Sequence, residues 1–352
     1  INNLPVNGAD RFSPTRDFMT MRSIGVMQEF TREDKLKARA GRYEREAEVA
    51  EAGRSLALAN LQRDTALAWL DRLFQERVRD MLVTQRDEAR LQIDAADAAY
   101  RGGRGTQADV FAARSAVAQI DDRIEQAERQ VATARTQLAR WIGSVASDPL
   151  GSVPALDTVR LSPQDLEAQL AHHPEIAVMQ KQEEVAQAEA DIAQANKKTD
   201  VSVELMYSQR GPAYSNMVSL NVSIPLQWDQ KNRQDRELAA KLASVEQKRA
   251  EREEATRAHV AEALAMLQEW RSDRERLARY DSSLLPLATE RTRASIAAYR
   301  GNAGTLTAVL EARRAEIDTR VERLRLEMGA ARLWAQLNYL VPAGHDTAAP
   351  RP

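Results

Sequence analysis

The sequence predicts a mainly α-helical protein with a small β part, built as a two-fold internal repeat of long coiled-coil helices and β-hairpins. Only 5% of the 352 residues are aromatic while 29% are charged. This composition favours long, exposed helices packed through small side chains over a thick core. One segment of the chain also recurs at a fixed offset, and two short runs alternate apolar and polar residues as strands do.

The repeat is clearest in a segment that begins at Ala98. Ala98–Gly102 reads AAYRG and recurs as Ala297–Gly301, 199 positions later. The match continues without gaps to Arg114, with ten identities in a window of 17 residues. At nearly the same offset, the run from Ile24 aligns with the run from Val222. Two copies of one unit are therefore predicted.

Each copy is expected to contain a β-hairpin, a very long helix, a tip and a heptad helix. The second copy starts near Ser162, and its equivalent in the first copy would precede Ile1. The first repeat is therefore expected to be N-terminally truncated, without its opening helix. The predicted segments are the first repeat 1–142 (hairpin 1–30, long helix 32–99, tip 100–106, helix 107–142), a linker 143–161, the second repeat 162–342 (helix 163–197, hairpin 200–226, long helix 230–299, tip 300–305, helix 306–341) and a disordered tail 343–352.

The helices are predicted from periodicity and from the placement of glycine and proline. Apolar residues alternate three and four apart along 110–141, which is the heptad seam of a packed helix. They are Val110, Ala113, Val117, Ile120, Ile124, Ala127, Val131, Ala134, Leu138 and Trp141. Residues 32–99 contain no proline and would form a helix of about 100 Å. Pro286 should kink or interrupt the counterpart helix 230–299, and glycine clusters predict tight tips between helices.

Two runs of the second copy, Asp200–Ser208 and Met217–Leu226, have the period of a strand. Their apolar face is expected at Val201, Val203, Leu205, Tyr207, Val218, Leu220, Val222 and Ile224. Nine or ten residues suffice for a strand to span a membrane. Four strands from two hairpins are too few to close a barrel, and an open sheet edge cannot face lipid, so a spanning role would require oligomerisation.

Several function classes have no support in the sequence. No run of 18 apolar residues predicts a transmembrane helix. The net charge is −2, so nothing favours nucleic-acid binding, and cysteine is absent. Phosphate-binding glycine loops, nucleophile elbows and HExxH motifs are also missing. We therefore expect no enzyme, no catalytic residue and no cofactor.

The order of elements resembles the outer membrane factor family, the TolC-like exit ducts of tripartite efflux pumps. The residues that carry the resemblance are His173-Pro174-Glu175 opening a helix, Ile224-Pro225-Leu226 ending the hairpin, and the doubled Tyr-Arg-Gly tips. Within that family, Arg210–Tyr214 (RGPAY) and Trp228–Arg233 (WDQKNR) resemble the heavy-metal efflux branch, the CzcC- and CusC-like subunits.

The resemblance implies a homotrimer in the outer membrane of a Gram-negative bacterium. Its strands would form a 12-stranded transmembrane β-barrel in contact with outer-membrane lipid, and its helices an α-helical barrel in the periplasm. The implied partners are a periplasmic adaptor (membrane fusion) protein and an inner-membrane RND-type pump, with heavy-metal cations as cargo. The tip residues implied to contact the adaptor are Tyr100, Arg101, Gly102, Gly105, Tyr299, Arg300, Gly301 and Gly304.

The resemblance also places a pore constriction just after the tips, where Asp109 and Glu311 are the acidic candidates. Three carboxylates in a ring would favour cations. A second acidic position of some relatives is Ala308 here, which puts a double ring in doubt. The plainer alternatives are that Asp109 and Glu311 are solvated helix charges and that the tip tyrosines only pack their turns.

Two further expectations concern metals and the protein class. His172 and His173 stand beside Glu175, but His259 and His345 show no useful spacing to them, so no metal site is predicted. The rival interpretation of the whole chain is a soluble coiled-coil structural or adaptor protein without membrane insertion. That interpretation leaves the alternating hairpins unexplained.

Overall fold

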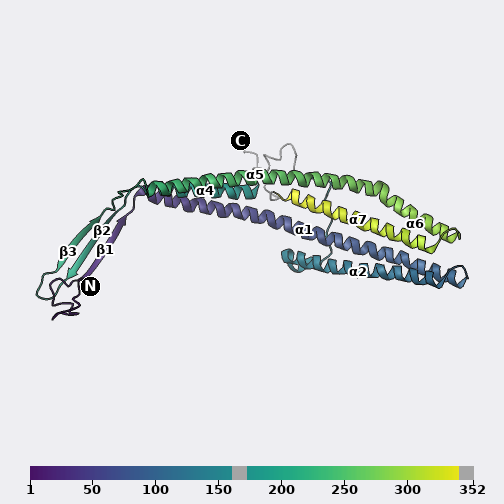
Figure 1. The fold of residues 1–352 in the computed structure, drawn as a ribbon, viewed down its shortest axis with the longest axis horizontal. Coiled ribbons are helices and arrows are strands. Elements are labelled where there is room, and N and C mark those ends of the chain that lie inside the picture. Colours follow the sequence, from purple (N-terminus) through teal and green to yellow (C-terminus); the bar gives the residue numbers. More distant parts are fainter. Residues whose placement is uncertain (161–172, 341–352) are drawn as a thin grey trace. The chain divides into compact units, whose positions relative to one another are not determined.

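The computed structural model describes residues 1–160 and 173–340 and divides the chain into two compact units. The first unit comprises residues 1–52 and 177–254, and the second comprises 53–176 and 255–352. The elements, of which the α-helices and β-strands are labelled in Figure 1, are β1 (Arg22–Phe30), α1 (Glu33–Arg101), α2 (Gln107–Ile142), the 3-10 helix η1 (Gly143–Ser147), α4 (Pro174–Ala195), β2 (Val201–Gln209), β3 (Met217–Ser223), α5 (Gln234–Arg279), the π-helical turn η2 (Tyr280–Leu284), α6 (Leu285–Arg300) and α7 (Leu306–Asn338).

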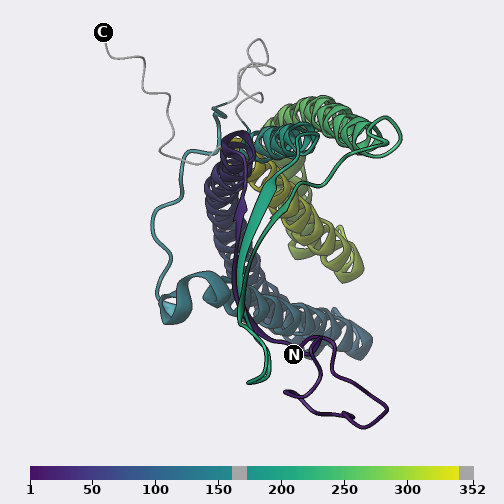
Figure 2. The same ribbon diagram turned by 90° about the vertical axis from the view of Figure 1, so that its left-hand side faces the viewer.

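The first unit contains a three-stranded antiparallel sheet in the order β1-β2-β3, whose strands lie side by side in Figure 2. The register places Val26 opposite Leu205 and Leu205 opposite Leu220. Side chains alternate between the faces of a strand, so these three residues share one face. Apart from Gln28 and the pair Arg22 and Gln209 at one end, that face is apolar: Ile24, Val26, Phe30, Val201, Val203, Leu205, Tyr207, Val218, Leu220 and Val222.

The opposite face of the sheet carries serine, glutamate and asparagine side chains together with three methionines. Ser23 and Ser208 are joined by a hydrogen bond of 2.9 Å between their hydroxyl groups. The Asn221 amide donates to the Glu204 carboxylate at 3.1 Å. The two faces of the sheet therefore differ in kind, one apolar and one able to hydrogen-bond.

The prediction of a hairpin over 1–30 was wrong. Only β1 is a strand there, and the segment before it contains one isolated bridge, between Asn2 and Met21. Pro5 has no N–H to donate to a ladder, and Asn3 has a φ of 58°, outside the β region. The expected return strand to Leu226 likewise ends at Ser223, just before Pro225. The described residues thus form three strands instead of the expected four.

The second unit is held together by the heptad seam. The structure buries nine of its ten predicted positions on α2, and only Trp141 is half-buried. Ile120 and Ile124 of α2 pack in one cluster with Leu82 of α1 and with Ile317 and Val321 of α7. The equivalent stripe on α7 continues through Ala331 and Ala335, which pack against Leu70, Leu73 and Phe74 of α1. Helix α1 is therefore covered by the seams of both copies.

The interruption expected at Pro286 is present. Helix α5 ends at Arg279, and the π-helical turn η2 leads into α6, where Pro286 occupies the first turn. The Leu285 N–H donates to the Tyr280 carbonyl, one residue further back than in an α-helix. Proline has no N–H to donate, and the change of helix type just before it accommodates that loss.

Several expected segments have different bounds or lie outside the described residues. The helix expected over 32–99 continues to Arg101, and the one expected over 306–341 ends at Asn338. Of the helix expected over 163–197, the described part is α4, and residues 163–172 lie outside the description, as does the tail 343–352. In 1–160 and 173–340, the structure contains no helix with the length and apolarity that a membrane span requires.

Replacing Phe74 by Ala should lower the free energy of unfolding by about 3–5 kcal/mol, because its fully buried ring would leave a cavity between α1 and α7. Phe111→Ala is the matched control, since the Phe111 side chain is 58% exposed. Urea unfolding of the purified protein, followed by circular dichroism, compares the two. Equal losses in both variants would contradict the packing described here.

Candidate functional site

The first tip, in the second unit, joins the end of α1 to α2 by a Schellman turn. The Gly103 N–H donates to the Tyr100 carbonyl at 3.0 Å, and the Arg104 N–H donates to the Ala99 carbonyl at 2.9 Å. Gly103 has a φ of 72°, a left-handed conformation that glycine adopts without steric cost. These bonds satisfy the last carbonyls of α1 and turn the chain back sharply.

The second tip, between α6 and α7, repeats the same turn. The Asn302 N–H donates to the Tyr299 carbonyl at 3.1 Å, and the Ala303 N–H donates to the Ala298 carbonyl at 2.8 Å. Asn302 occupies the repeat position of Gly103 and also has a positive φ, 62°. Asparagine is one of the few residues other than glycine that accept this conformation. Gly103 belongs to the glycine clusters that predicted the tips, whereas no sequence pattern pointed to Asn302.

Both helices that leave the tips begin with a threonine cap. The Thr106 hydroxyl accepts from the Asp109 N–H and the Thr305 hydroxyl from the Ala308 N–H, each at 3.2 Å. In the first copy the Asp109 carboxylate also accepts from the Thr106 N–H at 2.9 Å, which completes a capping box. Ala308 cannot return this bond. The acidic candidate Asp109 therefore has a local capping role in addition to any role in a pore.

Glycine at each tip lets the chain pass close to the end of the helix that it has just left. A Cβ added to Gly304 would lie 3.0 Å from the Cβ of Ala298, and one added to Gly105 would lie 3.2 Å from that of Ala99. These distances are tighter than ordinary van der Waals contacts. The glycines that the sequence analysis assigned to partner contact thus serve the geometry of the turn.

The two tip tyrosines differ in their surroundings. Tyr100 is 46% exposed, whereas Tyr299 packs against the cluster formed by Ala96, Val110, Ala113, Leu306 and Val309. The Tyr299 hydroxyl is buried and has no hydrogen-bond partner in the described part of the chain. The expectation that these tyrosines pack their turns therefore fits Tyr299 better than Tyr100.

The two tips lie against each other within the second unit. The cluster around Val110 and Leu306 joins the first turns of α2 and α7, so the helices that carry Asp109 and Glu311 meet here. A groove of about 370 Å³ is lined by residues of both hairpins, among them Arg104 and Arg300. Glu311 itself is exposed on α7. The two tips therefore enclose a groove of mixed lining, in which Arg104 and Arg300 stand beside apolar side chains such as Leu306 and Val309.

The expected membrane-facing residues lie on the apolar face of the sheet. Val201, Val203, Leu205 and Tyr207 follow β2, and Val218, Leu220 and Val222 follow β3 in register with them. Ile224 comes directly after β3. Leu220 is 67% exposed and Val218 is 70% exposed. A contiguous exposed apolar surface of this kind marks a site of contact with lipid or protein.

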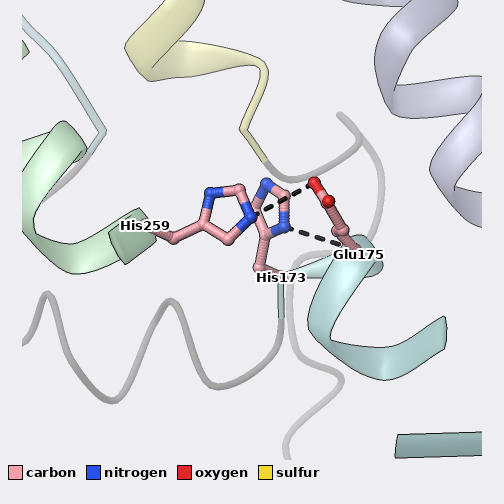
Figure 3. A group of neighbouring side chains, drawn as sticks. All are labelled: His173, Glu175 and His259. Atoms are coloured by element: carbon pink, nitrogen blue, oxygen red, sulfur yellow. Dashed lines mark hydrogen bonds and ion pairs between the residues drawn. The ribbon is translucent and has the colours of Figure 1, made fainter. Parts of the chain in front are cut away.

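A histidine pair that the spacing argument dismissed is brought together by the fold of the second unit. His173, directly before α4, lies beside His259 of α5, with ring centroids 4.6 Å apart (Figure 3). The His259 Nε2 is 3.1 Å from a carboxylate oxygen of Glu175. Burial, followed by the charge of nearby His259, lowers the pKa of His173 from 6.5 to about 4. No sequence spacing could reveal this group, because its members come from separate helices.

Comparison with known proteins identifies solved structures that share the fold of this chain. No protein-family model matches the sequence, and no curated protein matches it. Among solved structures, the outer-membrane channel OprN aligns with a TM-score of 0.76 and 15% identity over 92% of this chain and 81% of its own. The outer membrane protein VceC from Vibrio cholerae aligns with a TM-score of 0.74 and 16% identity, covering 90% and 78%. CusC, described for transmembrane channel formation, aligns with a TM-score of 0.77 and 14% identity, covering 92% and 83%.

The chain has the fold of these outer-membrane proteins. Identities of 14–16% do not extend the likeness beyond the fold. The mostly helical architecture with one small antiparallel sheet agrees with the fold class expected from the repeat.

Asn302→Val should destabilise the protein by about 1–2 kcal/mol, because a β-branched residue is strained at a positive φ, whereas Asn302→Gly should change stability little. Ala303→Val is the neighbouring control, at a residue of the same tip whose φ is not positive. Urea midpoints of the three variants test the turn. If Ala303→Val and Asn302→Val cost the same, backbone strain is not the cause.

Proposed function

We propose that the chain is one subunit of an outer-membrane exit duct of a tripartite efflux pump. The observation that carries the proposal is the exposed apolar face of the sheet, on a chain whose fold is shared with OprN, VceC and CusC. In a water-soluble coiled coil this apolar face would be exposed to water, which is energetically unfavourable. Burial in lipid removes that cost.

In this proposal the subunit works as a homotrimer in a Gram-negative outer membrane, with its helices in the periplasm. Backbone groups in lipid must pair, so the open edges of the three-stranded sheet require neighbouring chains. A 12-stranded barrel from three chains needs a fourth strand in each. The bridge between Asn2 and Met21 supports the segment before β1 as its source.

The proposed mechanism is passive conduction through a water-filled tunnel. The tips would close the periplasmic end until a periplasmic adaptor and an inner-membrane RND-type pump engage them, and the pump would supply the energy. The exposed Tyr100, the arginines Arg101 and Arg300, and the groove between the tips support this end as the adaptor contact. Nothing in this mechanism requires a chemical reaction.

The proposed cargo is a heavy-metal cation. Its support is the resemblance of Arg210–Tyr214 and Trp228–Arg233 to the heavy-metal efflux branch. The position of Asp109 and Glu311 at the start of the helices that leave the tips adds to it, because carboxylates repeated around a three-fold axis would attract cations.

Leu220→Arg should reduce the amount of protein in the outer membrane, because arginine on a lipid-facing strand costs about 2–4 kcal/mol near the bilayer midplane. Ser219→Arg is the matched control, as Ser219 is the preceding residue of β3 and lies on the opposite face of the sheet. Fractionation and immunoblotting measure the amount. Equal recovery of both variants would contradict a lipid-facing role for this face.

The native mass and location of the wild-type protein test the duct itself. A trimer recovered with the outer membrane is expected, and cells lacking the protein should become more sensitive to Zn²⁺ or Cd²⁺ and regain resistance on complementation. A soluble monomer or dimer would instead support the structural coiled-coil alternative. If the protein is an outer-membrane trimer but has no effect on metal sensitivity, the proposed duct stands and the proposed metal cargo is wrong.

A further inference from the structure

We infer that His173, Glu175 and His259 form a binding site for a divalent first-row transition-metal ion, for which Zn²⁺ is the suitable probe. One nitrogen of each histidine and one oxygen of Glu175 all lie within 4.8 Å of one another. All three residues belong to the second unit. The site is independent of the proposed function, because it would stabilise the fold of a channel subunit and of a soluble protein alike.

The ligand set matches transition-metal chemistry. Zinc accepts imidazole nitrogen and carboxylate oxygen at about 2.0–2.2 Å, and two histidines with one glutamate leave its fourth position to solvent. Tetrahedral ligands at that distance lie about 3.3 Å apart. The His259 Nε2 and Glu175 carboxylate oxygen are already 3.1 Å apart. The other pairs of ligand atoms lie within 4.8 Å, and rotation of the side chains would have to bring them closer.

The local sequence fixes the three side chains in place. The residue before a proline is held in an extended conformation, so His173 cannot join the helix that Pro174 begins. Glu175 follows within the first turn of α4, and His259 projects toward both from α5 (Figure 3). His173 is buried and the His259 side chain is 20% exposed, whereas the Glu175 side chain is 49% exposed. Two ligands are thus sheltered, and the third leaves an approach from solvent.

The chemistry of the ligands suits a metal. A neutral imidazole offers one nitrogen lone pair to a cation. The charge of Glu175, directly beside both rings, would offset part of the charge of a divalent ion.

The plainer alternative is that His173 only caps α4. Its Nδ1 accepts the Glu175 N–H at 3.3 Å, which is a long hydrogen bond. Neutral imidazole has one lone-pair nitrogen, so a bound metal would replace this contact. Capping alone needs neither His259 nor the Glu175 carboxylate, and asparagine caps a helix well. A substitution that keeps the cap and removes the imidazole therefore separates the two roles.

The test uses His173→Asn, which retains a capping side chain, and Glu175→Gln, which retains the shape of the carboxylate. Matched controls are His345→Asn and Glu290→Gln, the latter at an exposed glutamate of α6. The full chain, purified in detergent with a histidine-free tag, is dialysed against micromolar Zn²⁺ or Mg²⁺. Bound metal is measured by mass spectrometry of the elements, and thermal melting is measured with and without each ion.

We expect one zinc ion per chain in the wild type and both controls, with a rise in Tm on adding Zn²⁺ but not Mg²⁺, which prefers oxygen ligands. Both site variants should bind zinc at least about tenfold more weakly and lose the rise in Tm. His173→Asn should melt like the wild type without metal.

Zinc bound equally by the wild type and both site variants, or absent from the wild type, would overturn the inference. If His173→Asn failed to fold, Glu175→Gln would still decide between the outcomes. If the wild-type protein is soluble and binds one zinc ion per chain, the proposed membrane role is contradicted and the inferred metal site is supported.

Discussion

Apolar side chains spaced three and four apart along α2 and α7 are the constraint on which the second unit depends, because they bring both helices against α1. Many of these side chains are alanines, which let helices approach closely but bury little surface each. The few large buried groups, such as Phe74 and Leu138, therefore carry a disproportionate share of the stability. Long helices that pack along one narrow seam do not form the thick core of a globular domain. The same seam keeps neighbouring helices aligned up to their ends, and this alignment fixes the positions of the tips.

The two copies share backbone geometry and differ in chemistry. Gly103 and Asn302 produce the same turn, and Thr106 and Thr305 cap the helices that follow. Over this common backbone, Asp109 of the first copy corresponds to Ala308 of the second. Duplication thus preserved what the turn requires, while the side chains diverged: Tyr100 is exposed at one tip and Tyr299 is half-buried at the other.

The sequence was sufficient wherever a local pattern determines the structure. The heptad seam, the interruption at Pro286 and the alternating runs of β2 and β3 all follow from periodicity or from proline chemistry. The prediction of the first hairpin failed because Pro5 and the positive φ of Asn3 interrupt the ladder in a segment with weak alternation. The packing of Tyr299 is one of two alternatives that the sequence leaves open, but the meeting of His173 with His259 could not be foreseen, since it depends on segments that are adjacent only in the folded chain.

The π-helical turn at Tyr280–Leu284 explains a detail of the repeat. The copies are offset by 198 residues at Ile24 and Val222 but by 199 at Ala98 and Ala297, so the second copy contains one residue more between hairpin and tip. One residue inserted into an α-helix would rotate everything after it by about 100°. A π-helical turn accommodates that extra residue locally. The bulge thereby keeps the second tip in phase with the first, and the duplicated chain tolerates an insertion without losing its internal symmetry.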